Sequence, residues 1–229
     1  MKRENELIAI FGKKGGGKTS IAANFINNLN RLIIFDHNRE YERGLFVYNP
    51  QELIAALKKY HESAFRIIYR FDESMRLNDH AEYFFKAVNT IKNFTLLYEE
   101  IDRVSGPRFM PEGLDNIVNV GRHKGIDLIA LSRRPARVNR DLTSNADRIY
   151  IAGPLNEPND INYLAEFVGS DCSEKLRQLN RAEGKGSQFL EWTQEAVNIG
   201  FINFLTKEIN FDKIPPTLKN SNEAPPATS

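Results

Sequence analysis

Short apolar runs alternate with segments of helical periodicity along most of the chain. The runs are rich in Ile, Leu, Phe and Tyr, as buried strands are, and the segments between them repeat apolar residues every three or four positions. This alternation predicts an α/β fold, in which a mostly parallel sheet has helices on both faces. The predicted strands are residues 7–11, 31–35, 65–71, 94–98, 126–131 and 148–152, and the predicted helices are residues 18–28, 51–60, 79–92, 112–123 and 160–168.

The pattern changes in the last part of the chain. Two short apolar runs, at residues 188–191 and 199–204, follow a glycine-containing turn and predict a small C-terminal antiparallel edge. From residue 213 onward, four prolines stand among Ser, Asn, Ala and Thr, a composition typical of disordered segments. We therefore expect one folded domain over residues 1–212 and a disordered tail over residues 213–229.

The composition limits the possible classes of protein. With 229 residues, 41% of them hydrophobic, the chain can bury one substantial core but has no room for a second catalytic domain. Its 31 basic and 30 acidic residues nearly balance, so affinity for a polyanion must come from local clusters. The single cysteine, Cys172, suits a reducing compartment. The polar N-terminus and the lack of a long apolar run predict a cytoplasmic protein without membrane insertion.

One glycine-rich segment predicts a nucleotide site. The pattern GxxxxGK[ST] runs from Gly12 to Thr19, directly after the first predicted strand and into the first predicted helix. Backbone N–H groups can surround the phosphates, Lys18 can reach the β and γ oxygens, and the Thr19 hydroxyl can hold Mg²⁺. ATP and Mg²⁺ are therefore the expected cofactors. The expected nucleotide-binding residues are Gly12, Lys13, Lys14, Gly15, Gly16, Gly17, Lys18, Thr19 and Ser20.

Two adjacent carboxylates follow the predicted strand 94–98. A buried strand that ends in Glu99 and Glu100 delivers both to the carboxyl edge of the sheet, where open α/β sheets bind their ligands. We expect Glu99 to hold the magnesium ion, directly or through water, and Glu100 to polarise the attacking water. Lys18 and Glu100 are thus the first two predicted catalytic residues.

Further segments resemble the HerA/FtsK superfamily of ring-forming DNA-translocating ATPases, over roughly residues 5–170. The resemblance implies a RecA-like (ASCE) P-loop NTPase fold for the domain 1–212, ATP hydrolysis, and a ring of identical subunits, with a hexamer as the expected size. The matching segments are residues 34–41 (Asp-x-x-x-Glu-Tyr in the family), 99–103 (Asp-Glu-Ala-His-Arg), 121–125 (Gly-Arg-Lys-x-Gly), 131–135 (Ser-Gln-Arg-Pro) and 144–149, which leads into the last core strand.

The resemblance also implies a third catalytic residue. Arg122 stands where the family keeps an arginine finger, which a neighbouring subunit inserts toward the γ-phosphate. A permanently charged, planar guanidinium stabilises the charge that develops on a transferred phosphoryl group. The alternative is a surface arginine near a helix end.

Two positions depart from the family's pattern. Glu99 replaces the usual aspartate and is one methylene longer, which changes its expected contact with the ion. Arg133 replaces the glutamine that senses the γ-phosphate, and an arginine donates hydrogen bonds but cannot accept them. Arg133 is therefore a candidate sensor, DNA contact or interface residue, and the sequence does not decide among these.

A local excess of positive charge predicts the polymer substrate. Residues 103–140 contain eight basic and three acidic residues. In a ring this basic strip would repeat in every subunit and bind the backbone of double-stranded DNA without sequence preference. Interface salt bridges are the alternative use of Arg134, Arg137 and Arg140. The basic residues are Arg103, Arg108, Arg122, Lys124, Arg133, Arg134, Arg137 and Arg140.

Because the first core strand begins at about residue 7, the chain is expected to be a nearly bare motor. Bare motors of this size resemble the genome-packaging ATPases of tailless icosahedral viruses, which implies a capsid-vertex partner and a place in host cytoplasm or at the virion vertex. One alternative is a cellular HerA-like translocase or helicase, with a nuclease partner. Another is a nucleotide-dependent assembly or secretion ATPase that acts on protein. DNA-stimulated ATP hydrolysis separates the last alternative from the other two.

Overall fold

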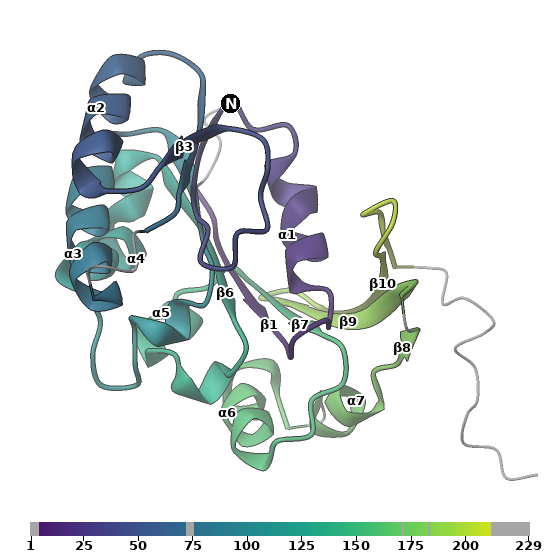
Figure 1. Cartoon of the computed structure of the whole chain (residues 1–229). Helices are drawn as coiled ribbons and strands as arrows, with labels where there is room; N and C mark the ends of the chain where they lie inside the picture. The colour runs from purple at the N-terminus through teal and green to yellow at the C-terminus, as the bar shows by residue number, and fades with distance from the viewer. Residues whose placement is uncertain (1–4, 72–75, 171, 183, 212–229) are drawn as a thin grey trace, which may run out of the picture.

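A single mixed sheet forms the centre of the computed structural model, which describes residues 5–71, 76–170, 172–182 and 184–211 (Figure 1). The strand order is β11-β10-β9-β7-β1-β6-β5-β2-β4-β3, with β8 paired to β9. The strands from β7 to β3 are parallel, and β8 to β11 continue the sheet in antiparallel fashion. The parallel strands are β1 (Leu7–Phe11), β2 (Arg31–Phe35), β3 (Leu45–Val47), β4 (Phe65–Tyr69), β5 (Phe94–Tyr98), β6 (Ile126–Ser132) and β7 (Arg148–Ala152).

Helices cover both faces of the parallel part. Figure 1 shows α1 on one side of the sheet and α2, α3 and α4 on the other. The helices are α1 (Lys18–Ile26), α2 (Pro50–Tyr60), α3 (Leu77–Val88), α4 (Glu112–Lys124), α5 (Arg140–Ser144), α6 (Pro158–Val168) and α7 (Cys172–Gln178), with 3-10 turns η1 (Ile101–Arg103) and η2 (Pro135–Arg137). Because helices cover both faces, the central strands are continuous apolar runs, in which apolar and polar residues do not alternate.

Alternate residues of β1 divide between two cores, because successive side chains of a strand point to opposite faces. Ala9 and Phe11 belong to the core beneath α2, α3 and α4. Ile8 and Ile10 belong to the smaller core beneath α1. Residues 7–11 are all buried, so β1 lies in the middle of the sheet with helices above and below. This burial fixes the carboxyl end of β1, from which the glycine-rich segment starts.

The predicted mostly parallel sheet, its helices and its C-terminal antiparallel edge are confirmed. The edge is longer than predicted: it comprises β8 (Arg181–Ala182), β9 (Gly186–Thr193), β10 (Val197–Asn203) and β11 (Ile209–Asn210). The short elements β3, α5, α7, β8 and β11 were not predicted, because two to seven residues carry too little periodicity.

Some predicted boundaries are wrong. The helix predicted over residues 79–92 is α3, which ends at Val88. The Asn89 side chain ends it by donating 2.8 Å hydrogen bonds to the carbonyls of Phe85 and Gly113. The strand predicted over residues 65–71 ends at Tyr69. The tail predicted over residues 213–229 lies outside the described residues.

In the described ranges, no helix combines the length and apolar character that a bilayer crossing requires.

Candidate nucleotide-binding site

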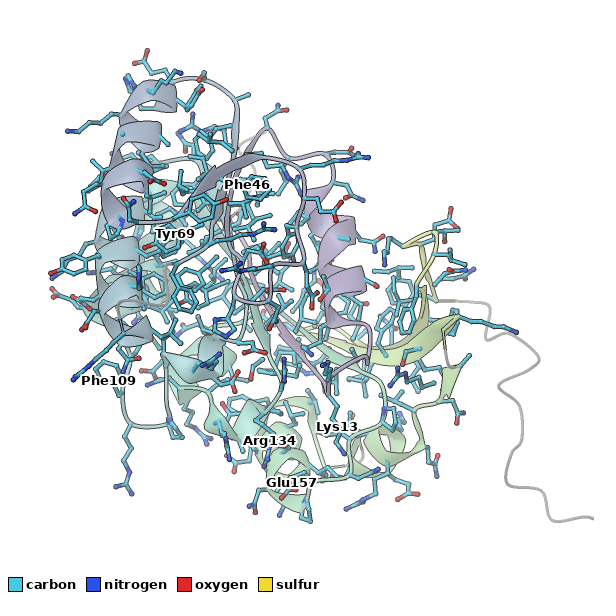
Figure 2. The ribbon with its side chains drawn as sticks, viewed as in Figure 1. Lys13, Phe46, Tyr69, Phe109, Arg134 and Glu157 are labelled. Carbon is cyan, nitrogen blue, oxygen red and sulfur yellow. The ribbon has the colours of Figure 1, made fainter. Side chains whose placement is uncertain are left out.

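The predicted phosphate-loop residues and the two predicted carboxylates, Glu99 and Glu100, meet at the carboxyl edge of the parallel strands. Figure 2 shows Lys13, Arg134 and Glu157, which follow β1, β6 and β7, at this same edge of the sheet. A cavity of about 490 Å³ lies there. Its lining combines the glycine-rich segment with residues from distant parts of the chain, namely Lys14, Gly15, Gly17, Lys18, Thr19, Ser20, Asn38, Glu40, Glu99, Glu100, Leu131, Arg133, Phe204 and Lys207.

The glycine-rich segment is folded as a compact loop against β1. Gly16 N–H donates to the Lys13 carbonyl at 3.1 Å, and Gly12 N–H donates to the Ser132 carbonyl at 3.2 Å. Gly17 caps α1 with φ of 105°, a left-handed conformation that favours glycine. The first N–H groups of α1 lack helical acceptors and lie at the positive end of the helix dipole, which suits an anion.

Lys18 begins α1, and its side chain turns back to the loop, where its Nζ donates to the Lys13 carbonyl at 3.2 Å. Burial lowers the pKa of Lys18, and the Arg133 guanidinium lowers it further, while the carboxylates of Glu40, Glu100 and Glu99 raise it. Bound phosphates would act on Lys18 as these carboxylates do. Their negative charge would raise its pKa and favour the charged ammonium.

Glu99 is nearly inaccessible to solvent, with 3% of its surface exposed at the end of β5. Its Oε2 accepts a 3.2 Å hydrogen bond from the Asn38 N–H. Burial raises the pKa of Glu99 to about 8, and the carboxylates of Glu40, Asp36 and Glu100 contribute, against the effect of the Asn38 hydrogen bond. A buried carboxyl group among other carboxylates is a place where a cation would be stabilising.

The donor atoms fit Mg²⁺. Thr19 Oγ1 donates to Glu40 Oε2 at 2.8 Å, which places a second carboxylate beside the predicted magnesium residue Thr19. Hydroxyl and carboxylate oxygens are hard ligands of the kind that Mg²⁺ takes. Within the described residues, no group of three or more His, Cys, Asp or Glu side chains could hold a metal ion. The ion would therefore take its remaining ligands from nucleotide phosphates and water.

Glu100 lies among two guanidinium groups and an imidazole. Its carboxylate forms an ion pair with Arg133 through Oε1, while Arg103 Nη1 and His37 Nε2 each lie 3.5 Å from Oε2. Its backbone has φ of 50°, an uncommon conformation for a residue with a side chain. Such strain, about 1–3 kcal/mol, persists only where surrounding contacts impose it, and it clusters at functional sites.

The sequence missed several residues of this site. Glu40 and Asn38 lie in the segment 34–41, which was singled out for its resemblance alone, and their contacts with Thr19 and Glu99 were not expected. Arg133, which the sequence left open, lies beside Glu100 and Lys18. Phe204 and Lys207 were not expected in the site, because the sequence predicted residues 199–204 only as a sheet edge and gave no role to the residues after it.

Arg122 does not join the other predicted catalytic residues. It lies near the C-terminal end of α4, which leads into the amino end of β6, at the edge of the sheet opposite the glycine-rich loop. There it forms an ion pair with Asp147, which accepts a 2.7 Å hydrogen bond from the Leu7 N–H. Within one chain the Arg122 guanidinium therefore cannot contact a nucleotide at the loop.

The basic strip is not a free cationic surface. At least five of its eight residues pair with carboxylates of the same chain, which leaves fewer for a polyanion. The pairs are Arg103 with Glu100, Arg122 with Asp147, Arg133 with Glu100, Arg134 with Asp160 and Glu157, and Arg140 with Glu166.

Comparison with known proteins gives a family and a fold. The family model described as the central domain of helicase HerA matches residues 5–209. The genome packaging NTPase B204 of Sulfolobus turreted icosahedral virus 2, in complex with sulfate, has a TM-score of 0.68 and 18% identity, over 86% of this chain and 96% of that chain. Its complex with AMPPCP has a TM-score of 0.66 and 18% identity, over 86% and 97%.

The DNA-packaging ATPase B204 from Sulfolobus turreted icosahedral virus has a TM-score of 0.63 and 18% identity, over 87% of this chain and 98% of that chain. At such low identity the similarity shows a shared fold. No significantly similar sequence is found among the curated proteins. The predicted resemblance to HerA/FtsK-type P-loop ATPases is thus confirmed.

Proposed function

Since the chain belongs to the family of the HerA helicase central domain, we propose that it couples ATP hydrolysis to the movement of double-stranded DNA. The observation that carries the proposal is the cavity in which the phosphate loop, two strand-end carboxylates and Arg133 converge. These are the groups that phosphoryl transfer requires: a phosphate cradle, a metal ligand and a residue that orients water.

Each group has a distinct role in the proposed reaction. The loop N–H groups and Lys18 bind the β- and γ-phosphates, and Thr19 and Glu99 hold Mg²⁺. The ion supplies positive charge that neutralises the phosphate oxygens. Glu100 orients water for attack on the γ-phosphate, which requires its carboxylate to turn from Arg133. Arg133 is then free to donate hydrogen bonds to the phosphate.

A ring of identical subunits, with a hexamer as the expected size, would complete the site. The position of Arg122 at the far edge of the sheet supports a finger that acts on the nucleotide of a neighbouring subunit. Glu99 and Glu100 would then belong to one subunit and Arg122 to the next.

The motor is proposed to package a viral genome, in host cytoplasm and at a capsid vertex. The support is the fold shared along nearly the whole length of the viral packaging NTPase. DNA would be bound through its phosphates by those residues of the basic strip that have no carboxylate partner among the described residues, and the binding should weaken steeply with salt.

The proposal is tested by measuring ATP hydrolysis by the full chain with and without duplex DNA, over a range of protein concentrations. We expect the rate per subunit to rise with DNA and with concentration, because the complete site needs two subunits. Glu100→Gln is the control: it should bind ATP yet hydrolyse it at least 100-fold more slowly. A rate independent of DNA would favour an ATPase that acts on protein, and a rate independent of concentration would contradict the ring.

A further inference from the structure

From the contacts of the C-terminal antiparallel edge, we infer that Lys207 binds the α-phosphate of the nucleotide and that Phe204 covers its nucleoside. The inference rests on the proposed function, since it assumes a nucleotide in the cavity. It assigns a binding role to the turn of residues 204–208, between β10 and β11, which lies beside α1 in Figure 1.

The direction of the bound nucleotide follows from the order of the strands. Glu99 and Glu100 follow β5, which lies on one side of β1, and β6 lies between β1 and β5. The strand β10 lies on the other side of β1, beyond β7 and β9. If the reacting γ-phosphate faces the two carboxylates, the α-phosphate and the nucleoside extend toward β10 and the turn that follows it.

The turn is docked on the phosphate loop and on α1. Lys207 Nζ donates to Ser20 Oγ at 3.1 Å, directly after Thr19 in the first turn of α1. The carbonyl of Lys207 accepts a hydrogen bond from the Asn24 side chain, one turn further along the helix. The backbone of Lys207 has φ of 61°, which these contacts hold in place.

Lys207 has the chemistry to bind a phosphate. An ammonium group has three N–H donors, and Ser20 takes one of them. The side chain is half-buried and lines the cavity. It comes from the turn after β10, whereas Glu99 and Glu100 follow β5 on the other side of β1. Lys18 and Arg133 supply positive charge beside those carboxylates, whereas Lys207 supplies it beside Ser20 in the first turn of α1.

Phe204 forms part of the wall of the same cavity. A Cβ atom on Gly17 would lie 2.9 Å from Cε1 of Phe204, so the ring lies directly against the loop backbone at a position without a side chain. The ring is only partly buried and lines the cavity. An aromatic face at this place can pack against a sugar or a base, whichever base it is.

The test is isothermal titration of the full chain with MgATP, MgADP and inorganic tripolyphosphate. Lys207→Met should weaken the binding of ATP and of ADP by a similar factor, about tenfold, because both nucleotides contain the α-phosphate. Lys207→Arg should recover most of the affinity. Phe204→Ala should weaken ATP binding about tenfold and leave the affinity for tripolyphosphate unchanged, since that probe has no nucleoside. Lys86→Met, which removes an exposed lysine paired with Glu82 on α3, is the matched control.

The outcomes distinguish a failure of the proposed function from a failure of the inferred roles of Lys207 and Phe204. If the wild-type chain binds neither ATP nor tripolyphosphate, the proposed function fails. If it binds both but Lys207→Met matches Lys86→Met, or Phe204→Ala weakens both probes equally, the inference about the turn is overturned. If Phe204→Ala keeps the circular dichroism spectrum and the tripolyphosphate affinity of the wild type, its phosphate loop remains folded.

Discussion

At the scale of single residues, the burial of Glu99, together with the carboxylates around it, opposes folding of the metal-free protein once Glu99 ionises. A carboxyl group whose pKa is about 8 in the folded state ionises near 4.5 when unfolded. Between these values the folded chain holds a proton that the unfolded chain has lost, so stability falls as pH rises through this window. Bound Mg²⁺ would reverse this effect, because the cation favours the ionised carboxylate of Glu99 and so stabilises the folded state.

This predicts a pH-dependent effect of Glu99→Gln. In the presence of EDTA, the melting temperatures of the variant and the wild type should be similar at pH 4.0, below both pKa values of Glu99. At pH 8.5 the variant should melt higher, by roughly 5 °C, because it cannot ionise. The measurement is thermal unfolding at both pH values. A difference that stays constant with pH would contradict the raised pKa of Glu99.

At the scale of elements, the close approach of α3 and α4 depends on a glycine. A Cβ atom on Gly113, in the first turn of α4, would lie 2.6 Å from the Cβ of Phe85 and 3.0 Å from its carbonyl carbon. Asn89 links the same two helices by its hydrogen bonds to Phe85 and Gly113. The packing therefore holds α4 in the position from which Arg122 projects.

Replacing this glycine should separate the two helices. Gly113→Ala should destabilise the chain by about 1–3 kcal/mol through overpacking, although alanine has the better helix propensity. The matched variant is Gly121→Ala in the same helix, where the nearest atom to an added Cβ lies at 3.4 Å. That variant should be neutral or stabilising by up to about 1 kcal/mol. Urea unfolding measures both, and equal effects would refute the contact between α3 and α4.

At the scale of the whole molecule, the two halves of the proposed active site lie at opposite edges of the sheet. The loop follows the carboxyl end of β1, while Arg122 precedes β6 at the amino end. Strands of five residues separate these edges by about 16 Å at roughly 3.3 Å per residue. The Arg122 guanidinium thus cannot reach a nucleotide at the loop of its own chain, and the proposed finger would act on the nucleotide of a neighbouring subunit.

Mixed rings should restore activity that each variant lacks alone. Arg122→Ala and Glu100→Gln should each bind ATP and lose hydrolysis. When equal amounts assemble together, half of the pockets are intact and half of their neighbours supply Arg122, so about a quarter of the wild-type rate should return. The rate of the co-assembled mixture is the measurement. Full activity of Arg122→Ala alone, or no recovery on mixing, would rule out the shared site.

The sequence by itself determined the α/β pattern, the phosphate loop and the strand-end carboxylates. Each of these is local: the glycine-rich segment lies between its own strand and helix, and Glu99 and Glu100 directly follow β5. Local backbone geometry and hydrophobic periodicity are sufficient to predict such features.

Only the tertiary structure decided which distant residues complete the site. Thr19 contacts Glu40, Glu100 contacts Arg133, and Ser20 contacts Lys207 across 187 positions. These pairs depend on the order of strands in the sheet, which places β10 beside the loop and β5 on its other side. Periodicity along a chain carries no information about that order, because any strand of the same apolar pattern could occupy each place.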